Sequence, residues 1–135
     1  MPGTSSGNFQ ATDTPLAAYN GYLYVSWETG ASNQLMYANF NGGTWGTPEP
    51  VGATSDAGPA LAVKGGKLYE SWINYNTLAV DWASFTGTTF TAPKAIPKAS
   101  IFIELGPALA GYDGALYDAW APDPSPSAIE YSLRA

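Results

Sequence analysis

The stretch LAAYNGYLYVSW, residues 16–27, decides the fold, because it recurs twice more along the chain. The second copy is LAVKGGKLYESW at 61–72, and the third is LAGYDGALYDAW at 109–120. The copies begin 45 and 48 residues apart (61 − 16 and 109 − 61). The chain is therefore built from three copies of one structural unit.

Each copy opens with two short strands joined by a tight turn. The turn dipeptides are Asn20-Gly21, Gly65-Gly66 and Asp113-Gly114, which favour the positive φ angles of a two-residue hairpin. The strand after the turn carries apolar residues on both of its faces, as is expected of a sheet packed between two neighbours. We therefore predict a β-hairpin in every copy.

Further strands follow each hairpin. A third strand is predicted at 35–40, 79–85 and 129–133. In the first two copies a glycine turn leads to a fourth, proline-containing strand at 47–51 and 91–97. Proline is tolerated in edge strands, so this strand is expected at the outer rim. Four strands in each repeat of this length are typical of a β-propeller blade.

The sequence predicts an all-β chain of 135 residues that forms one propeller domain of three four-stranded blades, at about 12–52, 57–98 and 105–135. Closed propellers have four to eight blades, so three blades do not close a ring. The simplest closed particle is a homodimer with six blades. The third copy ends before its outer strand, and we expect residues 1–11 to supply the strand that closes an incomplete blade.

Composition narrows the classes of partner and cofactor. Five Lys and Arg against eleven Asp and Glu give a net charge of −6, which opposes binding to nucleic acid. Without cysteine or histidine the chain lacks thiolate ligands and the commonest general base. The acidic residues do not have calcium-loop spacing. We expect neither a cofactor nor a metal site.

Targeting signals are also missing from the printed sequence. Its N-terminus has no basic segment followed by an apolar core, and no apolar stretch is long enough to span a bilayer. We expect a soluble protein that is not inserted in a membrane. Its compartment is left open, secretion included.

The repeat unit resembles the blades of bacterial propellers related to the sialidase-like and lectin-like families, over nearly the whole chain. The turn SFTGTTF at 84–90 is similar to the Asp-box of sialidase propellers without its aspartate. Three blades per chain are also similar to short fucose-binding lectins whose subunits assemble one ring. The resemblance implies a carbohydrate-binding propeller. Those lectins hold the sugar with Arg and Glu beside Trp, and Arg134 is the only arginine here, so the sugar is not carried over.

Catalytic residues are not expected. Sialidase chemistry needs a cluster of arginines, which one arginine does not supply. Glu70 and Asp118 occupy equivalent positions in successive copies and form a conceivable glycosidase pair, but Val25 stands there in the first copy. We favour the interpretation that these two acids line a solvated central channel.

Aromatic residues offer candidate ligand contacts. The tryptophan that ends every copy, at 27, 72 and 120, is expected to pack between blades. Where aromatic size varies between copies, a groove with a ring for stacking on a sugar is the alternative to core packing. Loops after the second strands add polar groups. The candidate ligand-binding residues are Trp45, Trp82, Tyr37, Tyr131, Glu28, Tyr75 and Asn76.

The function predicted from these features is multivalent, weak carbohydrate binding by a lectin-like propeller. A ligand-free structural or self-assembling propeller fragment is the first alternative, and a glycoside hydrolase is the second. We do not expect an enzyme.

Overall fold

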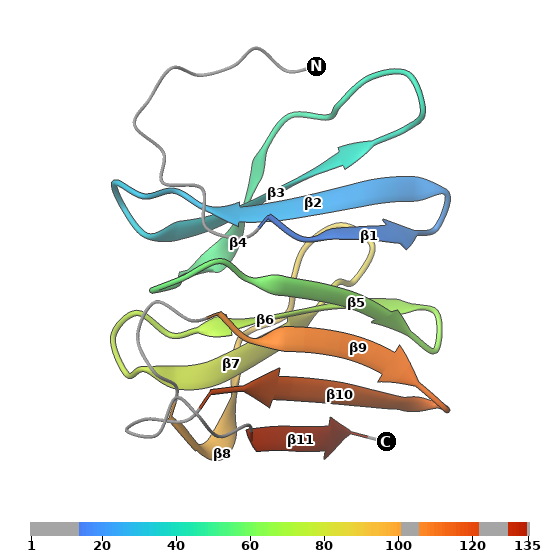
Figure 1. Ribbon diagram of the computed structural model, residues 1–135. Helices are drawn as coiled ribbons and strands as arrows, with labels where there is room; N and C mark the ends of the chain where they lie inside the picture. The colour runs from blue at the N-terminus through green and yellow to red at the C-terminus, as the bar shows by residue number, and fades with distance from the viewer. Residues whose placement is uncertain (1–13, 101–105, 122–129, 135) are drawn as a thin grey trace.

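The computed structural model describes residues 14–100, 106–121 and 130–134. Within these ranges the chain forms eleven strands and no helix. The strands make three antiparallel sheets that succeed one another in chain order (Figure 1). The prediction of an all-β chain is confirmed.

Each sheet is a simple meander in which every strand pairs with the next one along the chain. The strands of the first sheet are β1 (Leu16–Tyr19), β2 (Tyr22–Glu28), β3 (Gln34–Phe40) and β4 (Glu49–Thr54). Those of the second sheet are β5 (Ala60–Lys64), β6 (Lys67–Ile73), β7 (Ala79–Ser84) and β8 (Lys94–Ser100). Those of the third sheet are β9 (Ala108–Tyr112), β10 (Ala115–Trp120) and β11 (Glu130–Arg134).

The third sheet thus has three strands in the described part of the chain, where four were predicted. Its expected closing strand was assigned to residues 1–11, which lie outside the described residues. The predicted proline-containing strands are present as β4 and β8, each at the edge of its sheet.

The predicted hairpin turns are confirmed by their backbone angles. Asn20 and Gly21 have φ values of 49° and 80°, and Asp113 and Gly114 have values of 47° and 75°. Two consecutive positive angles define the turn whose twist matches that of the flanking strands. The Gly65-Gly66 turn follows the same rule, with φ values of 58° and 73°.

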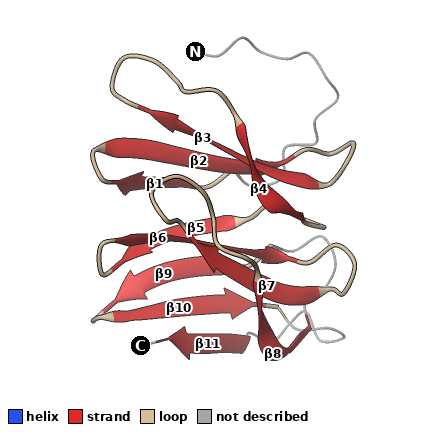
Figure 2. Ribbon diagram, turned by 180° about the vertical axis from the view of Figure 1, so that it is seen from behind, coloured by secondary structure: helices blue, strands red, loops and turns tan. Residues whose placement is uncertain are grey.

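The first strands of the three sheets lie side by side. Strand β5 packs beside β1 and beside β9, and Figures 1 and 2 show the outer strands β4 and β8 away from this row. The approach of β9 to β5 is close, because a methyl group on Gly111 would lie 2.6 Å from the Val63 carbonyl oxygen. The sheets therefore meet along their first strands and diverge toward β4 and β8.

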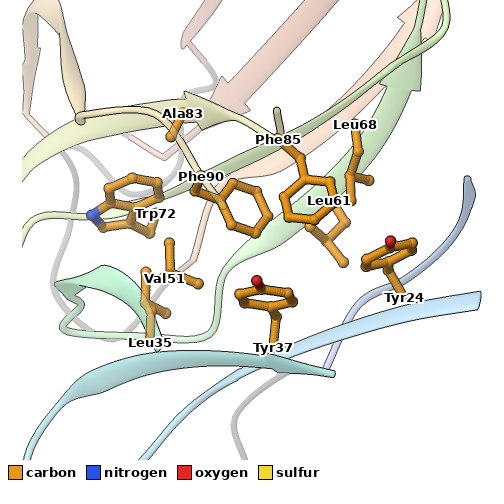
Figure 3. Packing of buried hydrophobic residues seen from close by; sticks show 10 residues of the cluster. All are labelled: Tyr24, Leu35, Tyr37, Val51, Leu61, Leu68, Trp72, Ala83, Phe85 and Phe90. Atoms are coloured by element: carbon orange, nitrogen blue, oxygen red, sulfur yellow. The ribbon is translucent and has the colours of Figure 1, made fainter. Parts of the chain in front are cut away.

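Two apolar clusters hold the sheets together. The larger one lies between the first and second sheets, as Figure 3 shows, and consists of Tyr24, Leu35, Tyr37, Val51, Leu61, Leu68, Trp72, Ala83, Phe85 and Phe90. The smaller cluster joins the second sheet to Trp120 of the third. Trp72 is 0% exposed and Trp120 is 5% exposed, which confirms the predicted packing role of the repeated tryptophan at these two positions.

Candidate functional site

The two acids that recur in the second strands are buried. Glu70 is 0% exposed and Asp118 is 1% exposed, so the expectation that they line a solvated channel is wrong. Each meets a serine of the preceding sheet instead: Ser26 lies in hydrogen-bond contact with Glu70 Oε1, and Ser71 Oγ donates to Asp118 Oδ1 over 3.3 Å. Such contacts allow polar groups to remain within an apolar interface.

The Ser26–Glu70 contact favours a neutral carboxyl group. Burial raises the pKa of Glu70 to about 8, against the lowering effect of the Ser26 hydrogen bond. The single Ser26 hydroxyl proton is donated to the Met36 carbonyl oxygen over 3.0 Å. Protonated Glu70 then donates from Oε1 to Ser26 Oγ, while Oε2 has no hydrogen-bond partner among the described residues. This acid is a structural group, since no solvent reaches it for catalysis.

A different group of polar residues gathers where β2 and β6 end. The loops 29–33, 55–59 and 74–78 meet there through backbone hydrogen bonds. The Ser55 amide donates to the Asn33 carbonyl oxygen over 2.8 Å, and the Tyr75 amide donates to the Thr54 carbonyl oxygen over 3.2 Å. We call this edge of the first and second sheets the loop end.

Glu28 is the titratable group that the loop end perturbs most clearly. It is the last residue of β2 and is half-buried. Burial raises the pKa of its carboxyl group, the negative charge of Asp56 raises it further, and a hydrogen bond with the Gly30 backbone lowers it. Among the described residues Glu28 Oε1 has no hydrogen-bond partner although it is buried. A hydrogen-bond donor that reached this oxygen would therefore satisfy a buried acceptor.

The neighbouring turn presents an aromatic ring and an amide. Asn74 fixes the turn, because its Oδ1 accepts from the Asn76 amide over 2.9 Å and its Nδ2 donates to Asp81 Oδ2 over 2.8 Å. The Tyr75 side chain is 46% exposed, and Asn76 is exposed as well. Three candidates from the sequence, Glu28, Tyr75 and Asn76, thus lie at the loop end, Glu28 as the last residue of β2 and the other two on the loop after β6.

The other four candidates lie elsewhere. Tyr37 is 7% exposed in the larger cluster, and its hydroxyl donates to the Thr88 carbonyl oxygen over 3.2 Å. Trp45 packs on Phe40 with ring centroids 5.3 Å apart.

Trp82 lies 6.1 Å from the Tyr69 ring, with Lys94 Nζ 5.3 Å from its own centroid. Tyr131 is 70% exposed on the third sheet. These four aromatic residues do not form one site with Glu28.

Sequence reasoning did not assign Asp56 to the binding site. Its carboxylate acts on Glu28 from the connection between β4 and β5, 28 residues further along the chain (56 − 28). In the sequence Asp56 is only an acidic residue that follows the predicted fourth strand. That position does not show that it lies near Glu28.

Two further findings concern metal sites and membrane-spanning helices. Among the described residues no three acidic side chains come together as a metal site. In the same ranges no helix has the length and hydropathy needed to cross a bilayer.

Comparison with known protein families and with curated proteins gave no match to this sequence.

Proposed function

We propose that this chain is a carbohydrate-binding protein and that its three sheets are blades forming half of a six-bladed β-propeller. Three consecutive meanders with their first strands in one row support the propeller assignment. A second copy of the chain supplies the other three blades. The sugar site is the loop end between the first two blades.

The observation that carries the sugar assignment is the Glu28 carboxyl group, with an unpartnered oxygen and the charge of Asp56 acting on it, at the loop end that also presents an exposed aromatic ring. Carboxyl and amide groups accept and donate hydrogen bonds to sugar hydroxyls, and an exposed ring such as Tyr75 packs against the C–H face of a sugar. The backbone hydrogen bonds between the loops hold these groups in place before a ligand arrives, which lowers the entropic cost of binding.

The site occurs once in each chain. The position of Glu28 is taken by Ile73 in the second copy and by Ala121 in the third, counted from the leucine of the LYxxW motif. A six-bladed ring of two chains therefore carries two equivalent loop ends. Two weak sites on one rigid body raise the avidity for a surface that displays many glycans.

Glu28→Gln is expected to weaken glycan binding at least about tenfold, because hydrogen bonds to charged groups contribute about 1.5–3 kcal/mol. The measurement is a glycan array followed by titration calorimetry with the best oligosaccharide. Glu49→Gln is the matched control: Glu49 is exposed at the start of β4, and its substitution should leave the affinity unchanged.

No saturable binding to any glycan would contradict the sugar assignment and leave a ligand-free structural propeller. Equal affinities for Glu28→Gln and the unmodified chain would move the site away from the loop end.

Glycoside hydrolysis is a second candidate because the same two carboxyl groups carry unequal environments. A carboxyl group with a raised pKa near a second carboxyl group is the arrangement of a general acid and its partner. Incubating the bound oligosaccharide with the protein and analysing its length separates the candidates. Shorter products that disappear in Glu28→Gln would establish the hydrolase.

A further inference from the structure

Two sheet faces at the ends of the molecule have no partner among the described strands. On the first sheet the face opposite the larger cluster carries Leu16, which is 58% exposed, and the half-buried side chains of Leu23, Trp27, Phe40 and Trp45. We call this surface the leading face.

On the third sheet, the face away from the second sheet carries Tyr112, Tyr117 and Tyr131. Tyr112 is 72% exposed and Tyr131 is 70% exposed. We call this surface the tyrosine face.

The contact between the first two sheets shows how a face with three tyrosines is covered. Tyr19, Tyr24 and Tyr37 of the first sheet pack edge-on against Phe85 of the second, with centroids 6.2, 5.4 and 5.6 Å apart. Tyr37 also packs against Phe90, at 5.1 Å. Edge-on aromatic pairs of this kind contribute roughly 0.5–1.5 kcal/mol each beyond their burial.

The tyrosine face repeats the first-sheet half of this contact. Tyr37 pairs with Ser26 across β2 and β3, and Tyr131 pairs with Ala119 across β10 and β11 at the same place in the repeat. The ring spacing is also similar: the Tyr19 and Tyr24 centroids lie 5.8 Å apart.

The corresponding pair on the third sheet, Tyr112 and Tyr117, has centroids 6.3 Å apart. The second sheet lacks this set, since Lys64 and Trp82 stand at two of its three positions.

The leading face of the first sheet repeats the second-sheet half of this contact. In the second sheet an isolated bridge joins Phe85 to Phe90, and their rings lie 5.1 Å apart. In the first sheet the same bridge joins Phe40 to Trp45, with rings 5.3 Å apart. Leu23 occupies the position of the fully buried Leu68. The leading face thus carries the same kind of bridged aromatic pair and the same leucine position as the face of the second sheet on which three tyrosines pack.

The positions that form the serine–acid hydrogen bonds between sheets also match between the tyrosine face and the leading face. Between sheets, a serine in the fourth position of LYxxW meets an acid in the third position of the next copy. At the free ends the fourth position is Ala119 and the third is Val25. Either substitution alone would leave a polar group buried without its partner, whereas both together make an apolar contact.

We propose that the tyrosine face of each chain packs on the leading face of a second copy, with Ala119 against Val25, so that two chains close a ring through two equivalent contacts. This inference rests on the proposed two-chain propeller and names the surfaces that form it. The register follows the contact between the first and second sheets.

The first test is the mass of the unmodified chain and of Tyr131→Lys in solution by sedimentation at micromolar concentration. The unmodified chain is expected to contain two copies and Tyr131→Lys one, because a lysine replaces a ring at the centre of the contact. Tyr131 is 70% exposed in the single chain, so circular dichroism should show an intact fold. Tyr75→Lys, an exposed tyrosine at the loop end, is the control and should retain two copies.

The second test rebuilds the polar pair. Val25→Glu is expected to weaken the pairing about a hundredfold or more, since it buries a carboxyl group opposite Ala119. Adding Ala119→Ser to the same chain gives that carboxyl group the partner that Glu70 has in Ser26, and most of the affinity should return. A double variant as weak as Val25→Glu would overturn the proposed register.

A monomeric unmodified chain would overturn both the two-chain ring and this inference, while glycan titration on that monomer tests the sugar site separately. A two-chain particle that survives both Tyr131→Lys and Val25→Glu would overturn the pairing of these faces alone.

Discussion

Glu70→Gln is expected to stabilise the protein strongly at pH 9 and to change its stability little at pH 4. The pKa of Glu70 is raised by burial from 4.5 to about 8 in the folded state. Above pH 4.5 the unfolded chain releases this proton and the folded chain retains it, so the folded state loses relative stability as the pH rises. The loss is complete once the pH passes about 8.

The magnitude follows from the difference in pKa. A change from 4.5 to about 8 corresponds to about 5 kcal/mol, at 1.36 kcal/mol for each pH unit. Domains of this size have free energies of unfolding of about 5–15 kcal/mol, so this one carboxyl group has a large effect. Glutamine remains neutral at every pH and its amide donates to Ser26 Oγ as the protonated acid does.

Urea denaturation at pH 4, 7 and 9 measures the effect. The difference in unfolding free energy between Glu70→Gln and the unmodified chain should grow with pH and then level off above pH 8. Glu49→Gln, at an exposed position, should follow the unmodified chain throughout. A difference that does not depend on pH would show that Glu70 is ionised in the folded state.

The repeated elements of the fold were predictable from sequence because they depend on local chemistry. Asn20-Gly21 and Asp113-Gly114 specify their turns through two adjacent positive φ angles, which few other residue pairs adopt without strain. The burial of Trp72 follows from its recurrence at one position in a chain rich in strands.

The environment of Glu70 was not predictable in this way. Its position on a strand was correct, but its partner Ser26 lies 44 residues earlier, in another sheet. An acid that repeats at one position is compatible with a channel and with a buried pair. Only the contact between sheets distinguishes the two, because the serine and the acid occupy different positions of the repeat.

The residues of the candidate site at the loop end were likewise only partly predictable from the sequence. Glu28 and Tyr75 were selected as polar or aromatic loop residues, whereas Asp56 acts on Glu28 through a fold that brings three loops together. The aromatic candidate Tyr37 illustrates the opposite case. Variation in ring size at its position is explained by the neighbour it covers, since Tyr37 packs on Phe85 and Phe90.

Gly106→Ala is expected to destabilise the protein by about 3 kcal/mol or more, as overpacking against backbone does. A methyl group on Gly106 would overlap the Gly58 carbonyl oxygen, well inside van der Waals contact. Gly58 and Gly106 precede equivalent prolines in successive copies, so the clash falls where the second and third sheets enter their first strands. Backbone atoms cannot turn aside as a side chain does, and β9 would have to move away from β5.

Two control substitutions separate this clash from a general effect of adding a methyl group. Gly30→Ala meets no atom within 4 Å and should change the free energy of unfolding by less than about 0.5 kcal/mol. At Gly46 the nearest atom is the Asn39 side-chain oxygen at 2.7 Å, and a side chain can rotate, so the cost should be intermediate. Urea denaturation that ranks Gly106→Ala with Gly30→Ala would contradict the close approach of β9 to β5.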